Sequence, residues 1–185
     1  MSSENSNSNG ANAAAAAAGA AAAAGAQGDQ QGQQAAPVIS IVTQYVKDLS
    51  FENQKAPQGL QPQDARPEIQ IRVDVRAQQL QAEQYEVQLE LGVEAKSGTE
   101  NVFLTELTYG GVFRLANIPP DSLQPLLMVE CPRMLFPFAR RIVADATRDG
   151  GFPPLMIDPI DFVSLYRRRI MAAQQQAGAN PPAQG

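Results

Sequence analysis

The chain has 185 residues and a formal net charge of −5, with 14 basic residues, 19 acidic residues and no histidine. This acidic balance argues against generic nucleic-acid binding, which needs clustered Lys and Arg to neutralise phosphates. The absence of histidine and the single cysteine exclude His-containing catalytic triads, His-ligated metal sites, CxxC redox pairs and internal disulfides. Most common hydrolase and metalloenzyme designs are thereby excluded, and no metal or other cofactor is expected.

Composition divides the chain into three parts. Residues 1–36 contain 15 alanines, 5 glycines and 5 glutamines but no aromatic or basic residue, so they are predicted to be a disordered extension. Residues 172–185 carry no charge and are predicted to be a disordered tail, which leaves 37–171 as one folded domain. No stretch is apolar enough for a transmembrane helix, and no positive residue precedes the alanine tract as in a signal peptide. Together with the single cysteine, this indicates a cytoplasmic protein without direct membrane insertion.

Alternating apolar and polar residues predict β-strands over 68–76 and 85–96. In both segments the odd-numbered positions are mostly apolar, and the even-numbered positions are mostly polar or charged. A further strand is expected over 102–109, and Gly110 with Gly111 predicts a β-bulge after it. Most acidic side chains of these strands have even numbers, so one sheet face is expected to be acidic.

The first predicted strand, 38–52, alternates less cleanly than the others. Residues 53–67 contain three prolines and are too long for a hairpin turn, so this strand should not pair with the next through a tight turn. Four antiparallel strands in a Greek-key-like order are the simplest interpretation. The apolar residues of the first strand that are expected on one face are Ile39, Ile41, Tyr45, Leu49 and Phe51.

From residue 119 onward the apolar period becomes helical. The pattern predicts a short helix with Ser122 as its N-cap and a second helix from Pro132 to Arg148. A last helix is expected to begin with Asp158 as N-cap and Pro159 at the first helical position. The predicted fold class is therefore α+β, with a four-stranded antiparallel sheet followed by helices packed on one side.

Two features could serve binding. The acidic sheet face is either a solvated surface or a docking surface for a basic partner, and Leu104 beside Glu106 favours docking because an apolar residue amid carboxylates can act as an anchor. The loop 150–160 is unusually apolar, so it either packs as core or forms the rim of a hydrophobic groove for another chain. Carboxylates four residues apart along the strand 85–96 are separated by more than about 10 Å, and no enzyme is expected.

Several segments occur in a fixed order over residues 39–171: YVKDLSFEN followed by AP, GGVFRLANI, CPRMLFPFAR, GGFPPLMIDPIDF and LYRRR. Together they resemble the SecB family of bacterial protein-export chaperones. The family fold is a four-stranded antiparallel sheet followed by helices, assembled as a tetramer from two dimers. The resemblance therefore implies the same fold as the alternation of residues predicts, and a homotetramer.

The resemblance also implies a cytosolic holdase that needs no nucleotide, binds unfolded precursor proteins and delivers them to the SecA motor. The motor would dock on the acidic face at Asp48, Glu52, Leu104 and Glu106. The client groove would lie between the sheet and the loop joining the last two helices. Its implied residues are Phe152, Leu155, Ile157 and Ile160, with Tyr45, Phe51 and Phe136 as weaker candidates.

The chain departs from the family in its alanine-rich extension, which is longer than the usual leader, and in its C-terminus, which lacks the usual acidic residues. The alternative hypothesis is a SecB-like oligomeric adaptor, or a chaperone dedicated to a toxin–antitoxin pair. Such a protein would share the groove but would not need the docking acids. Their presence favours export.

Overall fold

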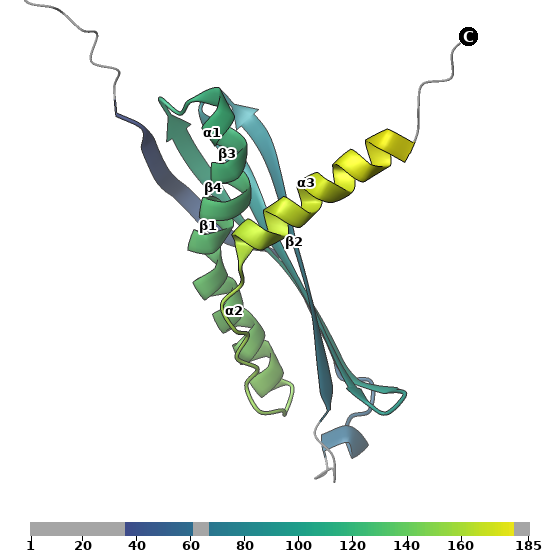
Figure 1. The fold of residues 1–185 in the computed structure, drawn as a ribbon. Coiled ribbons are helices and arrows are strands. Elements are labelled where there is room, and N and C mark those ends of the chain that lie inside the picture. The colour runs from purple at the N-terminus through teal and green to yellow at the C-terminus, as the bar shows by residue number, and fades with distance from the viewer. Residues whose placement is uncertain (1–35, 61–66, 180–185) are drawn as a thin grey trace, which may run out of the picture. The chain divides into compact units, whose positions relative to one another are not determined.

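The computed structural model describes residues 36–60 and 67–179, which belong to one unit, Gln34–Gly185. Four antiparallel strands form one sheet in the order β1-β4-β3-β2. Consecutive hairpins join β2, β3 and β4, and the first strand, β1, pairs with the last, β4. The predicted Greek-key-like order is therefore confirmed (Figure 1). Most of residues 1–36, and the last residues of the predicted tail, lie outside the described part. The strands are β1 Val38–Glu52, β2 Glu68–Gln81, β3 Gln84–Ser97 and β4 Glu100–Ala116.

Strand β1 contains two register shifts, at Val42 and at Lys47, each of which is an extra residue relative to β4. Each β-bulge reverses the face on which the following side chains lie, so the second restores what the first reversed. Between the bulges Tyr45 pairs with Gly110 and lies on the face away from the helices. The prediction that Tyr45 shares a face with Leu49 is therefore wrong, although the two ends of the strand face as predicted.

Strand β4 runs unbroken through Gly110 and Gly111, so the bulge predicted there is not formed. Both glycines pair in regular register with β1 and β3. Their role is close packing on the two faces of the sheet. A Cβ at Gly110 would lie 2.8 Å from Cε2 of Tyr45, and one at Gly111 would lie 2.7 Å from Cδ2 of Leu135 on α2.

One continuous helical rod follows the sheet. It comprises α1 Pro120–Pro125, a π-helical turn Leu126–Glu130 and α2 Cys131–Asp149. The predicted break before Pro132 is absent, because the wider π turn pairs the Cys131 N–H with the Leu126 carbonyl just before the proline that cannot donate. The predicted Ser122 cap is also wrong: the helix starts directly after Pro119 with proline at its first position and no side-chain cap.

The last helix, α3, spans Phe162–Ala179 and continues beyond Met171 into the segment predicted as a tail. Its N-cap is Asp161 rather than Asp158, because the Asp161 carboxylate accepts hydrogen bonds from the Ser164 N–H (3.0 Å) and hydroxyl (2.7 Å). These bonds lower the pKa of Asp161. The helix packs against the π-helical turn, and its Arg169 side chain reaches strand β2, where the Val75 carbonyl accepts a 2.7 Å hydrogen bond from it.

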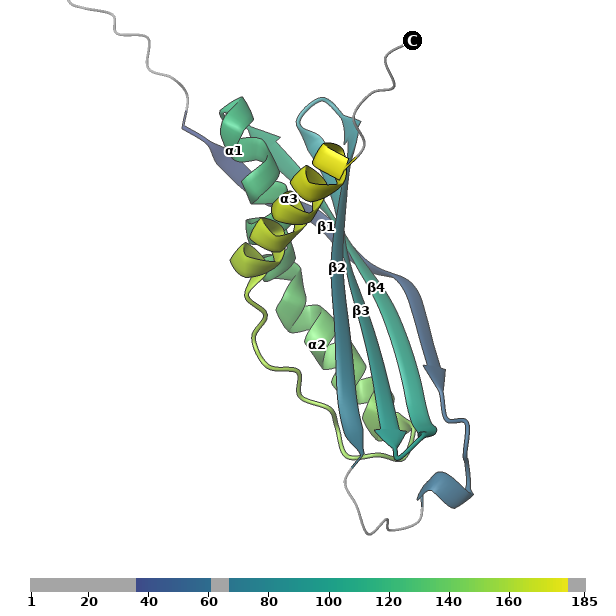
Figure 2. The same cartoon turned by 45° about the vertical axis from the view of Figure 1, so that its right-hand side comes forward.

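The hydrophobic core lies between one sheet face and the helices, which all pack on that side (Figures 1 and 2). Cys131 is buried there, and burial, followed by the nearby Glu130 charge, raises the pKa of its thiol to about 12. The cysteine is therefore a structural residue, as predicted. No helix in 36–60 or 67–179 is long and apolar enough to cross a membrane. The largest fully buried side chains include Leu89, Leu91, Leu107, Phe113, Leu135 and Phe162.

Candidate functional site

The sheet face opposite the helices, here called the outer face, carries the residues expected to dock the motor. Glu52 of β1 pairs with Leu104 of β4, and Asp48 lies further along the same face of β1. Glu106 follows Leu104 on that face, and its side chain is 51% exposed. The structure therefore brings all four residues together on two adjacent strands, with half-buried Leu104 among exposed carboxylates.

An arginine partly balances this negative charge. Arg72 of β2 lies across Gly92 and places its Nη2 atom 3.0 Å from Oε1 of Glu106. The Arg72 side chain is 78% exposed, and an exposed ion pair of this kind contributes about 0–1 kcal/mol. A basic partner could therefore replace Arg72 at small cost. A hollow of about 120 Å³ lies beside the pair, and its charged lining consists of Asp48, Arg72, Asp74, Glu90 and Glu106.

Glu86 lies on the same face but is only 4% exposed, whereas its even-numbered position predicted a solvated carboxylate. Its oxygens accept hydrogen bonds from the Tyr45 hydroxyl, Lys47 Nζ at 3.0 Å, Gln88 Nε2 at 2.8 Å and the Gln78 amide. Burial disfavours the charged form, but these donors outweigh burial and lower the pKa of Glu86 to about 2. We call these five residues the Glu86 cluster.

The loop between α2 and α3 closes over one end of the sheet through an aromatic cluster. The Phe152 ring lies 4.9 Å from that of Phe103 and 6.4 Å from that of Phe51, and the latter two rings stack at 5.7 Å between centroids. Thr147 ties the loop to α2, because its buried Oγ1 accepts the Leu155 N–H at 2.9 Å. The apolar character of the loop thus reflects packing on the core.

Parts of this loop remain accessible. Met156 is 59% exposed. Ile157 and Phe136 are only 3% and 7% exposed and belong to the core, and Tyr45 lies on the other side of the sheet. The expected groove residues that the structure leaves half-buried on the helix side are Phe51, Phe152, Leu155 and Ile160.

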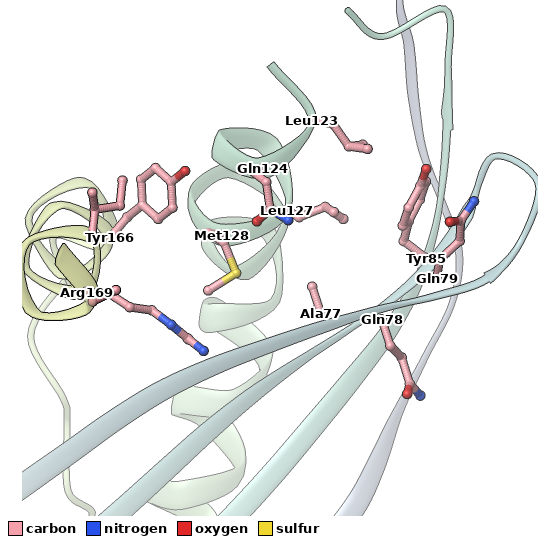
Figure 3. A pocket seen from close by; sticks show the side chains of 12 residues that line it. Ala77, Gln78, Gln79, Tyr85, Leu123, Gln124, Leu127, Met128, Tyr166 and Arg169 are labelled. Carbon is pink, nitrogen blue, oxygen red and sulfur yellow. The ribbon is translucent and has the colours of Figure 1, made fainter. Parts of the chain in front are cut away.

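A hollow of about 580 Å³ lies beside α3, and no sequence motif indicated it (Figure 3). Tyr166 and Arg169 of α3, Leu123 and Met128 of the helical rod, and Tyr85 at the start of β3 contribute to its walls. Its lining combines apolar side chains with a few polar ones. The apolar stripe of the last helix was predictable, but the hollow depends on the angle at which α3 crosses the rod.

An antiparallel sheet with helices on one face, acidic residues on the other and an apolar cluster beneath a loop defines an α+β protein with two separate surfaces of different character. The family model described as preprotein translocase subunit SecB matches residues 32–174. The chain belongs to the SecB family.

Bacterial relatives agree with this assignment. A protein-export protein SecB of Parvibaculum lavamentivorans is 55% identical over 147 residues, which are 80% of this chain and 88% of the relative. One of Bartonella quintana is 48% identical over 145 residues, 78% of this chain and 92% of the relative. Among solved structures, a Mycobacterium tuberculosis SecB-like chaperone in complex with an antitoxin peptide aligns with a TM-score of 0.55. The alignment covers 66% of this chain and 91% of the chain of that chaperone, at 15% sequence identity. This similarity therefore supports the fold alone.

Proposed function

We propose that this chain is an ATP-independent chaperone of the bacterial cytoplasm that binds unfolded precursor proteins and delivers them to the SecA motor for export. The chain is not proposed to be an enzyme. Membership of a family whose relatives are named protein-export proteins supports this function. The observation that carries the proposal is the gathering of Asp48, Glu52, Leu104 and Glu106 on one sheet face while the apolar loop cluster lies on the other.

The docking surface is the outer face. Its carboxylates attract a basic partner over several ångströms, and half-buried Leu104 adds an apolar contact at their centre. The Arg72–Glu106 pair is exposed on both sides and is readily exchanged for a basic side chain of the motor. A chaperone dedicated to a toxin–antitoxin pair would not need these acids, so their arrangement favours export over that alternative.

Client capture takes place on the helix side, at the partly exposed apolar residues around the loop. Burying one Phe-sized or Leu-sized side chain contributes about 1.5–3 kcal/mol, while ordering each residue of a client costs about 1–2 kcal/mol. One such contact does not hold an unfolded chain. Several weak contacts on one assembly do, because binding at the first raises the effective concentration at the others.

Assembly as a homotetramer, a dimer of dimers, would supply those repeated contacts. Strand β1 is an edge strand of the sheet and pairs with β4 on one of its two sides. An unpaired edge with apolar side chains is a favourable site for association with another chain. The exposed apolar side chains of this strand include Ile39, Ile41, Val46 and Leu49.

The two-surface proposal is tested with one variant for each surface. Phe152→Ala with Ile160→Ala should weaken binding of a permanently unfolded polypeptide and leave SecA binding unchanged. Glu106→Lys should weaken SecA binding and leave client binding unchanged. Both are measured by isothermal titration calorimetry, with light scattering to check the assembly. Ile157→Ala is unsuitable because that side chain is only 3% exposed and its truncation would destabilise the core.

A charge-matched control is Glu130→Lys, on the helical rod, where the carboxylate pairs with Arg133. It makes the same charge change as Glu106→Lys but lies away from the outer face, so it should bind SecA normally. Equal loss of client and motor binding in both surface variants would contradict the division into two surfaces. Normal SecA binding by Glu106→Lys would contradict docking on the outer face.

A further inference from the structure

The bulge at Lys47 determines which way the first docking residue faces. Val46 pairs with Tyr109 on the helix side, and Asp48 pairs with Thr108, which leaves Lys47 without a partner in β4. Because of this extra residue, Tyr45, Lys47 and Asp48 all lie on the outer face. In a regular strand the side chains of residues 45 and 48 would lie on opposite faces.

The Glu86 cluster fixes the part of β1 that lies at the bulge and on its N-terminal side. Tyr45 crosses β4 above Gly110, where no Cβ obstructs it, and donates its hydroxyl hydrogen to Glu86 of β3. The ammonium group of Lys47, the bulged residue itself, lies 3.0 Å from Oε1 of Glu86. Gln78 of β2 completes a polar connection that extends from β1 across the whole sheet.

A carboxylate that is 4% exposed is costly to bury unless its oxygens are hydrogen-bonded. Glu86 therefore stabilises the arrangement only while Tyr45 and Lys47 remain in place, and two of its four donors come from the bulged part of β1. The regular strand without the bulge would move Tyr45 or Lys47 away and leave the buried charge with fewer donors. Glu86 thus favours the bulged register over the regular one.

We propose that Glu86 is a positioning residue for motor docking: through Tyr45 and Lys47 it holds the β1 bulge that turns Asp48 and Glu52 toward the outer face. This inference depends on the proposed docking function. Glu86 itself is nearly inaccessible and does not contact the motor. Its effect on docking is transmitted by the register of β1, over the few residues between Lys47 and Glu52.

The test uses the full chain in its native assembly with two variants, Tyr45→Phe and Glu86→Gln. Tyr45→Phe removes one hydroxyl group and no charge, so weaker docking cannot arise from a changed electrostatic field. Its matched control is Tyr109→Phe, on the helix side, where the hydroxyl makes a 3.4 Å hydrogen bond to Gln44. SecA binding and client binding are measured by calorimetry, and amide hydrogen exchange is followed over residues 48–52.

Both variants should bind SecA roughly 3- to 10-fold more weakly, bind the unfolded client normally, and exchange the amides of residues 48–52 faster. The double variant should be no weaker than Glu86→Gln alone, because both changes disrupt one cluster. Tyr109→Phe should match the unmodified chain in SecA binding. A purely structural role would instead weaken client and motor binding together.

The same set separates this inference from the proposed function. If Glu106→Lys loses SecA binding while Tyr45→Phe and Glu86→Gln bind normally, the positioning role is overturned and docking on the outer face stands. If all three variants bind SecA normally, both the positioning role of Glu86 and docking on the outer face are overturned. Unchanged exchange over residues 48–52 in both cluster variants overturns the positioning role whatever the docking result.

Discussion

Replacing Glu86 with glutamine should reduce stability by an amount that depends on pH. The native environment lowers the pKa of Glu86 from 4.5 to about 2, and each pKa unit corresponds to 1.36 kcal/mol. The charged cluster should therefore contribute about 3 kcal/mol to the free energy of unfolding at pH 7. Since the native pKa is the lower one, this contribution is complete above about pH 5 and is lost as pH falls toward 2, reaching about 2 kcal/mol at pH 3.5.

The assay is urea unfolding followed by circular dichroism at pH 7, 5 and 3.5, with the unmodified chain and Glu86→Gln at one protein concentration. The control is Glu90→Gln, on the same strand, whose partly exposed carboxylate pairs with Arg76 at 3.1 Å. An exposed pair contributes about 0–1 kcal/mol, so this control should lose little stability. If the difference in the free energy of unfolding between Glu86→Gln and the unmodified chain stays constant from pH 7 to 3.5, the reasoning is refuted.

Three further changes test other contacts. Thr147→Val should leave the Leu155 N–H without its acceptor and cost about 1–3 kcal/mol in urea unfolding, whereas Thr147→Ser should cost less because it keeps the hydroxyl. Leu135→Ala, at a side chain with no exposed surface, should cost about 2–5 kcal/mol by the same measurement, and a loss below 1 kcal/mol would contradict its core position. Asp161→Ala removes the cap of α3 and should speed exchange of the Ser164 amide, while Asp161→Asn should preserve its protection.

Much of the sheet was predictable from the sequence because burial on one face enforces alternation. Strands β2 and β3 keep one register along residues 68–79, and their odd-numbered residues face the core as predicted. The Greek-key-like order followed from the length of the connection 53–67. The docking acids could be placed on one face because Asp48 and Glu52 follow the second bulge, where the alternation is regular again.

The residues whose positions were predicted wrongly owe their environment to neighbours that are distant in the sequence. Tyr45 lies on the outer face because β4 offers Gly110 beneath it, and this pairing has no local signal in β1. Glu86 is buried by side chains from three strands, so its environment could be recognised only once the register was known. The predicted N-cap of α3 is wrong for a different reason. Asp158 and Asp161 are both suitable N-cap residues, and only the hydrogen bonds to Ser164 decide between them.

The two bulges of β1 mark the positions at which its length can vary. Val42 and Lys47 have no partner in β4, so removing either residue would remove a bulge and leave the other residues of the strand paired and facing as before. Removing a paired residue would instead shift the register and move the side chains beyond it to the opposite face. Homologous chains should therefore differ in the length of this strand at the two bulges, by one residue at each.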